Sequence, residues 1–231
     1  MPAVKAVAAL IPAFNEEKYI FDTVRAVLTI PEIEDVLVVD DGSLDDTAGA
    51  ARRAGARVLS LPANGGKGEA LNRGAAKIDA EVVVLLDADL GSTAGEARRL
   101  IIPVLEGRAD LAIASFPESC QKGGFGLAKR LAGTGIKLFT GLETKSPLSG
   151  QRAMTREVLR RVTPFAAGFG VEVALTIKAA RAGFRLLEVP VKMGHRDSRR
   201  DVRGFLHRGK QFWDVTRTMW ELRNQELVVR N

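Results

Sequence analysis

The feature that most constrains this 231-residue sequence is the alternation, through its first half, of short apolar runs with segments of helical periodicity. The apolar runs, which we expect to be buried strands, are residues 7–11, 36–39, 57–59, 82–86 and 111–114. The segments that we expect to be helices are residues 16–28, 45–54, 67–76 and 94–105. Because strands that are apolar throughout must be covered on both faces, the pattern predicts an α/β fold with a mostly parallel sheet between helices.

Composition narrows the class of protein. Apolar residues make up 46% of the chain and charged residues 27%, which is typical of a globular enzyme. Cys120 is the single cysteine, so a disulfide framework or a thiolate metal cluster is not expected. The chain has no apolar run of the roughly 18–20 residues that cross a bilayer. The first apolar run continues directly into Asn15-Glu16-Glu17, which favours a buried strand over a signal peptide. We expect a cytoplasmic protein.

The second half of the chain is organised differently. We expect helices at residues 125–139 and 171–182, a strand at 185–189 and a last helix at 204–222. This predicts one domain over residues 1–200 and a C-terminal helical extension over 201–231. The helix at 125–139 would pack on the sheet, cover the mouth of the active site or dock on a membrane surface. The last helix would pack on the domain or in a homodimer interface.

Charge is unevenly distributed between the two parts. Residues 145–231 hold 18 Lys and Arg against 8 Asp and Glu, whereas residues 1–144 hold 16 against 20. A basic excess at one end suggests an anionic partner there: phosphate groups, the inner membrane surface or nucleic acid. The alternative is a solvated basic helix.

Four polar clusters follow expected strands, and ligands of open α/β sheets bind outside the carboxyl ends of the strands. The clusters are residues 12–16, 40–43, 64–68 and 87–89. Each one alone could be an ordinary turn. Because parallel strands end at one rim of the sheet, their coincidence there predicts a binding site.

The Asp87-Ala88-Asp89 cluster predicts a metal site. Two neighbouring carboxylates repel each other unless a cation or a hydrogen-bond donor lies between them. Mg²⁺ and Mn²⁺ prefer oxygen ligands and often take one or two carboxylates together with substrate phosphates. The alternative is a turn with two solvated acids.

The cluster Asn64-Gly65-Gly66-Lys67-Gly68 opens an expected helix, and its glycines let backbone N–H groups approach a phosphate or a base. It is not a Walker loop, because no Gly-Lys-Ser/Thr ends a six-residue span. No GxGxxG fingerprint follows the first strand. The ATPase and dinucleotide interpretations therefore lose their main support.

Taken together, these segments resemble family 2-type glycosyltransferases of the GT-A fold. The matching signatures are IPAFNEE (11–17), VVDDGSLDDT (38–47), NGGKGEALNRG (64–74), LLDADL (85–90), PLSGQRAM (147–154), GFGVEVAL (168–175) and GFRLLEVPV (183–191). The resemblance covers about residues 5–215. Within the family, the chain is similar to polyprenyl-phosphate sugar synthases and to glucosyl-3-phosphoglycerate synthases.

The resemblance implies roles for individual residues. Those that would hold the nucleoside are Pro12, Ala13, Glu16, Asp41 and Lys67. Asp87 would bind the nucleotide and Asp89 the metal. Glu172 would be a catalytic or acceptor-orienting carboxylate, its alternative being a helix-start glutamate favoured by the helix dipole. His195 matches a metal-binding histidine of the phosphoglycerate-type relatives that the polyprenyl-type relatives generally lack, and its alternative is a structural or exposed histidine.

Acceptor contacts are expected from two segments. Gly150, Gln151 and Arg152 would lie near the acceptor, and the run that includes Arg196 and Arg199 would bind its phosphate or the donor pyrophosphate. That run lacks the interleaved aromatic residues of a single-stranded nucleic-acid platform, so we expect no nucleic-acid partner.

The expected function is metal-dependent transfer of a sugar from a UDP- or GDP-type donor to a phosphate-bearing acceptor such as polyprenyl phosphate or phosphoglycerate. One rival is a sugar-phosphate nucleotidyltransferase, which would show a Gly-rich basic loop where this chain has Pro12-Ala13-Phe14-Asn15-Glu16. The other is a noncatalytic nucleic-acid or membrane-surface binder, which leaves Asp87 and Asp89 unexplained. The two resembled subgroups differ in retention or inversion at the anomeric carbon, so both outcomes stay open.

Overall fold

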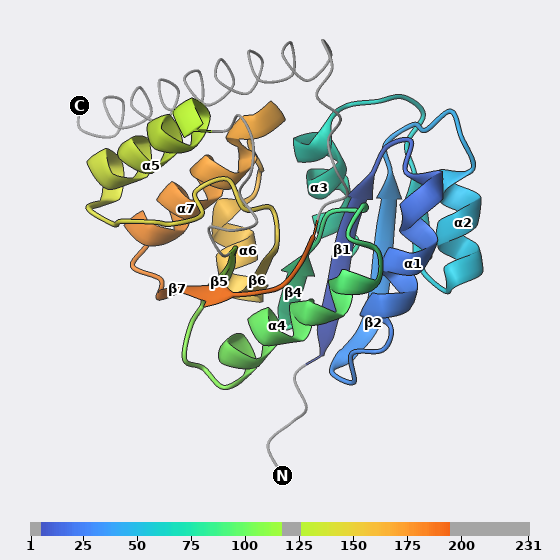
Figure 1. The fold of residues 1–231 in the computed structure, drawn as a ribbon, viewed down its shortest axis with the longest axis horizontal. Helices are drawn as coiled ribbons and strands as arrows, with labels where there is room; N and C mark the ends of the chain where they lie inside the picture. The colour runs from blue at the N-terminus through green and yellow to red at the C-terminus, as the bar shows by residue number, and fades with distance from the viewer. Residues whose placement is uncertain (1–5, 117–125, 195–231) are drawn as a thin grey trace.

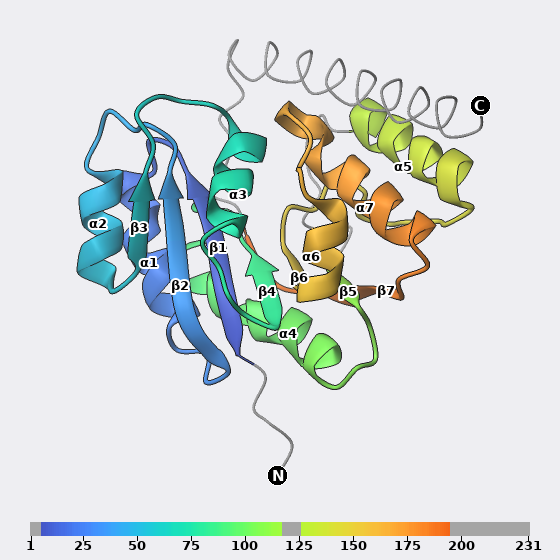
Figure 2. The same cartoon turned by 180° about the vertical axis from the view of Figure 1, so that it is seen from behind.

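The computed structural model describes residues 6–116 and 126–194, which form a seven-stranded sheet between two layers of helices (Figures 1 and 2). The strands are β1 Val7–Ala13, β2 Ile33–Asp40, β3 Arg57–Ser60, β4 Val82–Leu85, β5 Leu111–Ser115, β6 Arg152–Thr155 and β7 Leu186–Pro190. Their order in the sheet is β3-β2-β1-β4-β6-β5-β7. Only β6 runs antiparallel to its neighbours, β4 and β5. The expected mostly parallel sheet is confirmed.

The helices are α1 Glu17–Val27, α2 Thr47–Ala54, α3 Lys67–Ala75, α4 Arg98–Leu105, α5 Gly126–Thr140, α6 Arg156–Val162 and α7 Val171–Arg181, with short 3₁₀ turns η1 Gly91–Ala97 and η3 Gly168–Gly170. The chain leaves β1 for β2 on one side and later returns to place β4 on the other. The carboxyl ends of β1 and β4 therefore meet at the point where strand order reverses, which is where ligands bind in such sheets.

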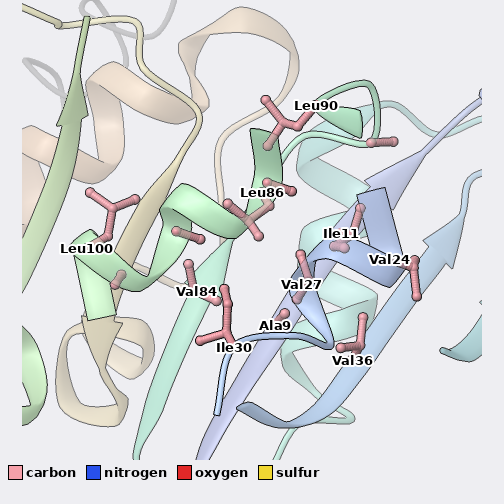
Figure 3. Packing of buried hydrophobic residues seen from close by; sticks show 14 of the residues in the cluster. Ala9, Ile11, Val24, Val27, Ile30, Val36, Val84, Leu86, Leu90 and Leu100 are labelled. Atoms are coloured by element: carbon pink, nitrogen blue, oxygen red, sulfur yellow. The ribbon is translucent and has the colours of Figure 1, made fainter. Parts of the chain in front are cut away.

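One face of the sheet packs against α1, α2, η1 and α4. Figure 3 shows Ile11 and Val84 of the sheet, Val24 and Val27 of α1 and Leu100 of α4 as members of one buried cluster. All five side chains are fully buried. Burial of each aliphatic side chain contributes about 1.5–3 kcal/mol, so this cluster helps to hold α1 and α4 against the sheet.

The other face packs against α3, α6 and α7. Its cluster joins Leu10 of β1 and Val39 of β2 to Leu71 of α3, Val158 of α6 and Leu175 of α7. Helix α5 is further out: Ala132 and Ile136 pack on Val173, Ala174 and Ile177 of α7. The helix expected at 125–139 therefore exists, but it packs on another helix and not directly on the sheet.

Three elements differ from the sequence-based expectation. The sequence pattern did not predict β6 and α6, because a four-residue strand that begins with an arginine carries no apolar alternation. The expected helix at 94–105 begins as the 3₁₀ turn η1 before continuing as α4. The expected boundary at residue 200 and the helix at 204–222 lie outside the described residues. Within residues 6–116 and 126–194, no helix is long and apolar enough to cross a membrane.

Candidate active site

The polar clusters that follow β1, β2 and β4, and the loop that opens α3, lie together at one rim of the sheet. The backbone N–H of Asp41 donates to the carbonyl of Ala13, which extends the pairing of β1 and β2 to the start of both loops. Pro12 and Ala13 are still strand residues, paired with Val39 and Asp40. The loops therefore start from fixed, paired backbone.

The carboxylate of Asp41 binds the glycine loop, residues 64–68. Its two oxygens accept the backbone N–H groups of Gly65, at 2.9 Å, and Gly66, at 2.8 Å. Asp41 is buried, and charge-assisted bonds of this kind are about twice as strong as neutral ones. Gly66 has φ of +85°, a conformation that suits glycine, and it directly precedes α3. The carboxylate thus fixes where α3 begins, and with it Lys67.

Lys67, the first residue of α3, joins two acids from distant parts of the chain. Its Nζ donates to Asp87 Oδ1 at 2.7 Å and to Glu172 Oε1 at 2.8 Å. Burial by itself lowers the pKa of Lys67, but the carboxylates of Asp87 and Glu172 outweigh it and hold that pKa above its usual value. Lys67 therefore stays cationic between the two acids.

Glu172 lies in the first turn of α7, where the helix dipole favours a negative charge. Only 9% of its side chain is exposed. A carboxylate buried to this degree needs a partner, and Lys67 supplies it. Glu172 therefore lies at a helix start, and its side chain also contacts Lys67 at the rim of the sheet.

Asp87 is enclosed from two sides. While Lys67 holds Oδ1, the side-chain amide of Gln151 donates to Oδ2 at 2.5 Å. Gly150 lies against the same carboxylate: a Cβ there would come within 2.7 Å of Lys67 Nζ and 2.8 Å of Asp87 Oδ2. The loop before β6 thus forms the wall of the site beside Asp87.

Gln151 and Arg152 are inside the protein and not on the surface of the site. Gln151 is 0% exposed and Arg152 is 1% exposed. The Arg152 guanidinium donates from Nε to the carbonyl of Ser149 and from Nη1 to Thr176 Oγ1 of α7, each at 2.8 Å. Burial lowers the pKa of Arg152 to about 10, against the opposing effect of Glu172 and Glu188. The Gln151 side chain thus faces Asp87, and the Arg152 side chain faces α7. Of the three residues expected to contact the acceptor, Gly150 is the one that lies at the wall of the site.

Asp89 lies in the loop after β4, which is fixed by a residue that sequence reasoning missed. Thr23 of α1, fully buried, donates to the carbonyl of Ala88 at 2.8 Å, and its oxygen accepts the N–H of Gly91 at 2.8 Å. A threonine in the middle of an amphipathic helix gives no sequence signal of this role. Its two bonds fix the backbone on both sides of Asp89.

Glu16 faces the aspartates of the neighbouring loops. Its pKa is raised to about 7, first by burial and then by the negative charges of Asp89, Asp45 and Asp87. The loop that carries it is tied to the β2 loop, since Glu16 N–H donates to Thr47 Oγ1 at 2.8 Å. The rim therefore concentrates negative charge beside Asp89.

The negative charge at this rim of the sheet is suited to binding a divalent cation. Among the described residues no cluster of three or more His, Cys, Asp or Glu side chains has the geometry of a complete protein metal site. Mg²⁺ and Mn²⁺ commonly bind through one or two carboxylates and complete their shell with substrate phosphates and water. Asp89, with Glu16 near it, fits such an open site. His195, the other expected ligand, and Arg196 and Arg199 lie outside the described residues.

Comparison with known proteins decides the family. The model of glycosyl transferase family 2 matches residues 8–170. The chain belongs to glycosyl transferase family 2. The residues matched include all of β1 except its first residue, β2 to β6, and the loops that carry Glu16, Asp41, Lys67, Asp87 and Asp89.

Two curated relatives of this family 2 chain are 31% identical to it. Glycosyltransferase AglJ of Haloferax volcanii matches over 195 residues, 82% of this chain and 63% of its own length. Glucosyl-3-phosphoglycerate synthase of Mycobacterium tuberculosis matches over 199 residues, 75% of this chain and 60% of its own length. The chain thus spans about three fifths of the length of these two relatives.

The fold is shared with solved structures of the mycobacterial synthase. Its complex with Mg²⁺ and UDP has a TM-score of 0.78 at 29% identity, covering 94% of this chain and 79% of the other. Its complex with Mn²⁺, UDP-glucose and phosphoglyceric acid has a TM-score of 0.75 at 27% identity, covering 93% and 80%. The expected GT-A fold is confirmed.

Proposed function

We propose that this family 2 member transfers a sugar from a UDP-sugar to a phosphate-bearing acceptor, with Mg²⁺ or Mn²⁺ as cofactor. One observation carries the proposal: Lys67 joins Asp87 at the carboxyl end of β4 to Glu172 at the start of α7. The acid on the donor side and the acid on the acceptor side therefore both bind the ammonium group of Lys67, at the point where strand order reverses. A sugar-phosphate nucleotidyltransferase would need the Gly-rich basic loop that this chain lacks after β1.

The donor half of the site is the rim formed by the loops of β1, β2 and α3. We assign nucleoside binding to Pro12, Ala13, Glu16, Asp41 and Lys67, and nucleotide contact to Asp87. Asp41 does this through the glycine loop, since both its oxygens already accept Gly65 and Gly66. The UDP bound by the mycobacterial synthase supports uracil as the base.

The metal half of the site is Asp89, next to the negative charge of Glu16. A divalent cation held there supplies stabilisation of the negative charge on the departing diphosphate. His195 is our candidate for a further ligand. The Mg²⁺ and Mn²⁺ complexes of the mycobacterial synthase support either ion.

The acceptor half is the wall made by Gly150 and the buried acid Glu172. We assign Glu172 to orienting the acceptor or the reacting sugar, and Arg196 and Arg199 to the acceptor phosphate. The complex of the mycobacterial synthase with phosphoglyceric acid favours phosphoglycerate over polyprenyl phosphate as the first acceptor to test.

The test uses the purified full chain with UDP-glucose, Mn²⁺ and 3-phosphoglycerate, and follows UDP release together with the mass of the product. We expect transfer that requires the metal and falls on the order of 100-fold in Asp89→Asn. Glu106→Gln, an exposed carboxylate paired with Arg108, is the matched control and should retain wild-type rate. Wild-type activity in Asp89→Asn would overturn the metal assignment. Absence of UDP-sugar and UDP binding by calorimetry with Mn²⁺ would overturn the function.

A further inference from the structure

The hydrogen bonds around Asp87 and Glu172 form a closed ring that passes through the protein interior. On the exposed side Lys67 joins the two acids. On the buried side Gln151 holds Asp87 Oδ2, and Thr176 Oγ1 donates to the carbonyl of Glu172 at 2.9 Å.

Arg152 closes the ring between those two buried contacts. Its Nη1 donates to Thr176 Oγ1, and its Nε donates to the carbonyl of Ser149, in the turn that leads into Gln151. The Ser149 hydroxyl donates to Gln151 Oε1 at 3.4 Å. One guanidinium thus ties α7 to the loop before β6.

Burial of a guanidinium group at this position costs free energy unless surrounding groups compensate its charge. No carboxylate forms an ion pair with Arg152 among the described residues, and its Nη2 has no hydrogen-bond partner there. Burying a charge without a direct counter-charge costs several kcal/mol, and packing an apolar side chain of similar volume avoids that cost. Stability alone therefore does not explain an arginine that is 1% exposed.

The positive charge of Arg152 lies beneath a site that is rich in carboxylates, and it can stabilise their negative charge. Glu172 and Glu188 are the carboxylates whose negative charge reaches Arg152. Glu188 of β7 in turn accepts the backbone N–H of Lys145, at 2.9 Å, and of Ser146, at 3.2 Å, in the same loop. The loop before β6 is therefore anchored at both of its ends, by Glu188 and by Arg152.

We propose that Arg152 is a positioning residue for sugar transfer: through Ser149 and Gln151 it fixes Asp87, and through Thr176 it fixes Glu172, so that the donor-side and acceptor-side acids are held at one separation across Lys67. This inference rests on the proposed function. It assigns to Arg152 an interior role in place of direct contact with an acceptor phosphate. Fixed geometry of this kind is worth much of the barrier lowering in group transfer, because a displacement of about 1 Å can cost on the order of 100-fold in rate.

The first test uses Thr176, since its variants leave Arg152 in place. Thr176→Val keeps the shape and removes the hydroxyl, whereas Thr176→Ser keeps the hydroxyl. We expect kcat of Thr176→Val to fall about tenfold with UDP affinity, measured by calorimetry with Mn²⁺, within about twofold of wild type, and Thr176→Ser to recover most of the rate. Thr140→Val is the matched control, because Thr140 also donates to the carbonyl four residues back, in α5, and has no part in the ring.

The second test is a double-mutant cycle on kcat/KM between Gln151→Leu and Thr176→Val, with the thermal midpoint of each variant recorded. If the ring acts as a unit, the double variant should lose much less than the product of the two single losses. Multiplicative losses, or a folded Thr176→Val with wild-type kcat, would overturn the positioning role. A merely structural role would lower the thermal midpoint and leave kcat per folded molecule unchanged, which also overturns it. Failure of the proposed function shows separately, as wild-type protein that neither binds UDP nor transfers sugar.

Discussion

Lys67 and Glu172, 105 residues apart in the chain, are joined by a hydrogen bond of 2.8 Å between Nζ and Oε1. This contact brings the start of α7 to the strand ends of the first half of the molecule. Since Nζ also donates to Asp87, the lysine keeps two acids close together that would otherwise repel each other.

Removal of the positive charge of Lys67 should lower both activity and stability. In Lys67→Met, Asp87 and Glu172 face each other without a counter-charge, and we expect kcat/KM to fall about 100-fold and the free energy of unfolding by roughly 1–3 kcal/mol. Steady-state kinetics and urea unfolding measure the two effects. Lys137→Met, in an exposed pair with Glu143, should change neither. Wild-type kinetics in Lys67→Met would contradict the central role of this contact.

Gly150 should not tolerate a side chain. A Cβ at this position would lie 2.7 Å from Lys67 Nζ and 2.8 Å from Asp87 Oδ2, so Gly150→Ala must displace both. We expect about a tenfold loss of kcat/KM and a destabilisation of roughly 1–3 kcal/mol. In α5, by contrast, the nearest atom to a Cβ on Gly133 is 4.0 Å away, so Gly133→Ala should stabilise the protein by about 0.5–1 kcal/mol without kinetic effect. Equal behaviour of the two variants would show that the wall beside Asp87 is not rigid.

The Asp41 carboxylate should matter through the loop that it holds. An Asn in its place offers one acceptor oxygen for the two N–H groups of Gly65 and Gly66 and turns a donor toward the other. We expect Asp41→Asn to lose about 1–3 kcal/mol of stability and to raise KM for the nucleotide sugar more than it lowers kcat. Asp35→Asn, which breaks an exposed pair with Arg57, should cost less than about 1 kcal/mol and leave KM unchanged.

Glu16 predicts a pH dependence of stability. Its pKa is about 7 in the folded protein and near 4.5 when unperturbed, so the folded state binds more protons and is progressively destabilised as the pH rises from 4.5 through 7. The free energy of unfolding of Glu16→Gln, relative to wild type, should therefore increase by about 1 kcal/mol from pH 5 to pH 8, after allowance for partial exposure.

Denaturant unfolding at both pH values measures this difference, and Glu106→Gln serves as the exposed control, with a pH-independent difference expected. Addition of Mn²⁺ should shrink the gain, because a nearby cation favours the ionised carboxylate. A gain that is the same at pH 5 and pH 8 would contradict the crowding of acids around Glu16.

Much of the architecture follows from local sequence. The apolar runs that became β1, β2 and β4 and the periodic segments that became α1, α3 and α7 are visible without a structure, because burial on both faces of a parallel sheet leaves a continuous apolar run. β6 was not predictable in this way. It lies antiparallel between β4 and β5 and begins with a buried arginine, a residue type that a sequence pattern assigns to the surface.

The sequence by itself determined that Glu16, Asp41, Lys67, Asp87 and Asp89 would gather, because residues that follow parallel strands end at one rim of the sheet. Only the tertiary structure decided their partners: Lys67 with Glu172, Gln151 with Asp87, Thr23 with the loop of Asp89. The physical reason is that strand ends are set by short-range pattern, whereas a hydrogen bond between side chains distant in the chain depends on how the helices pack over the sheet.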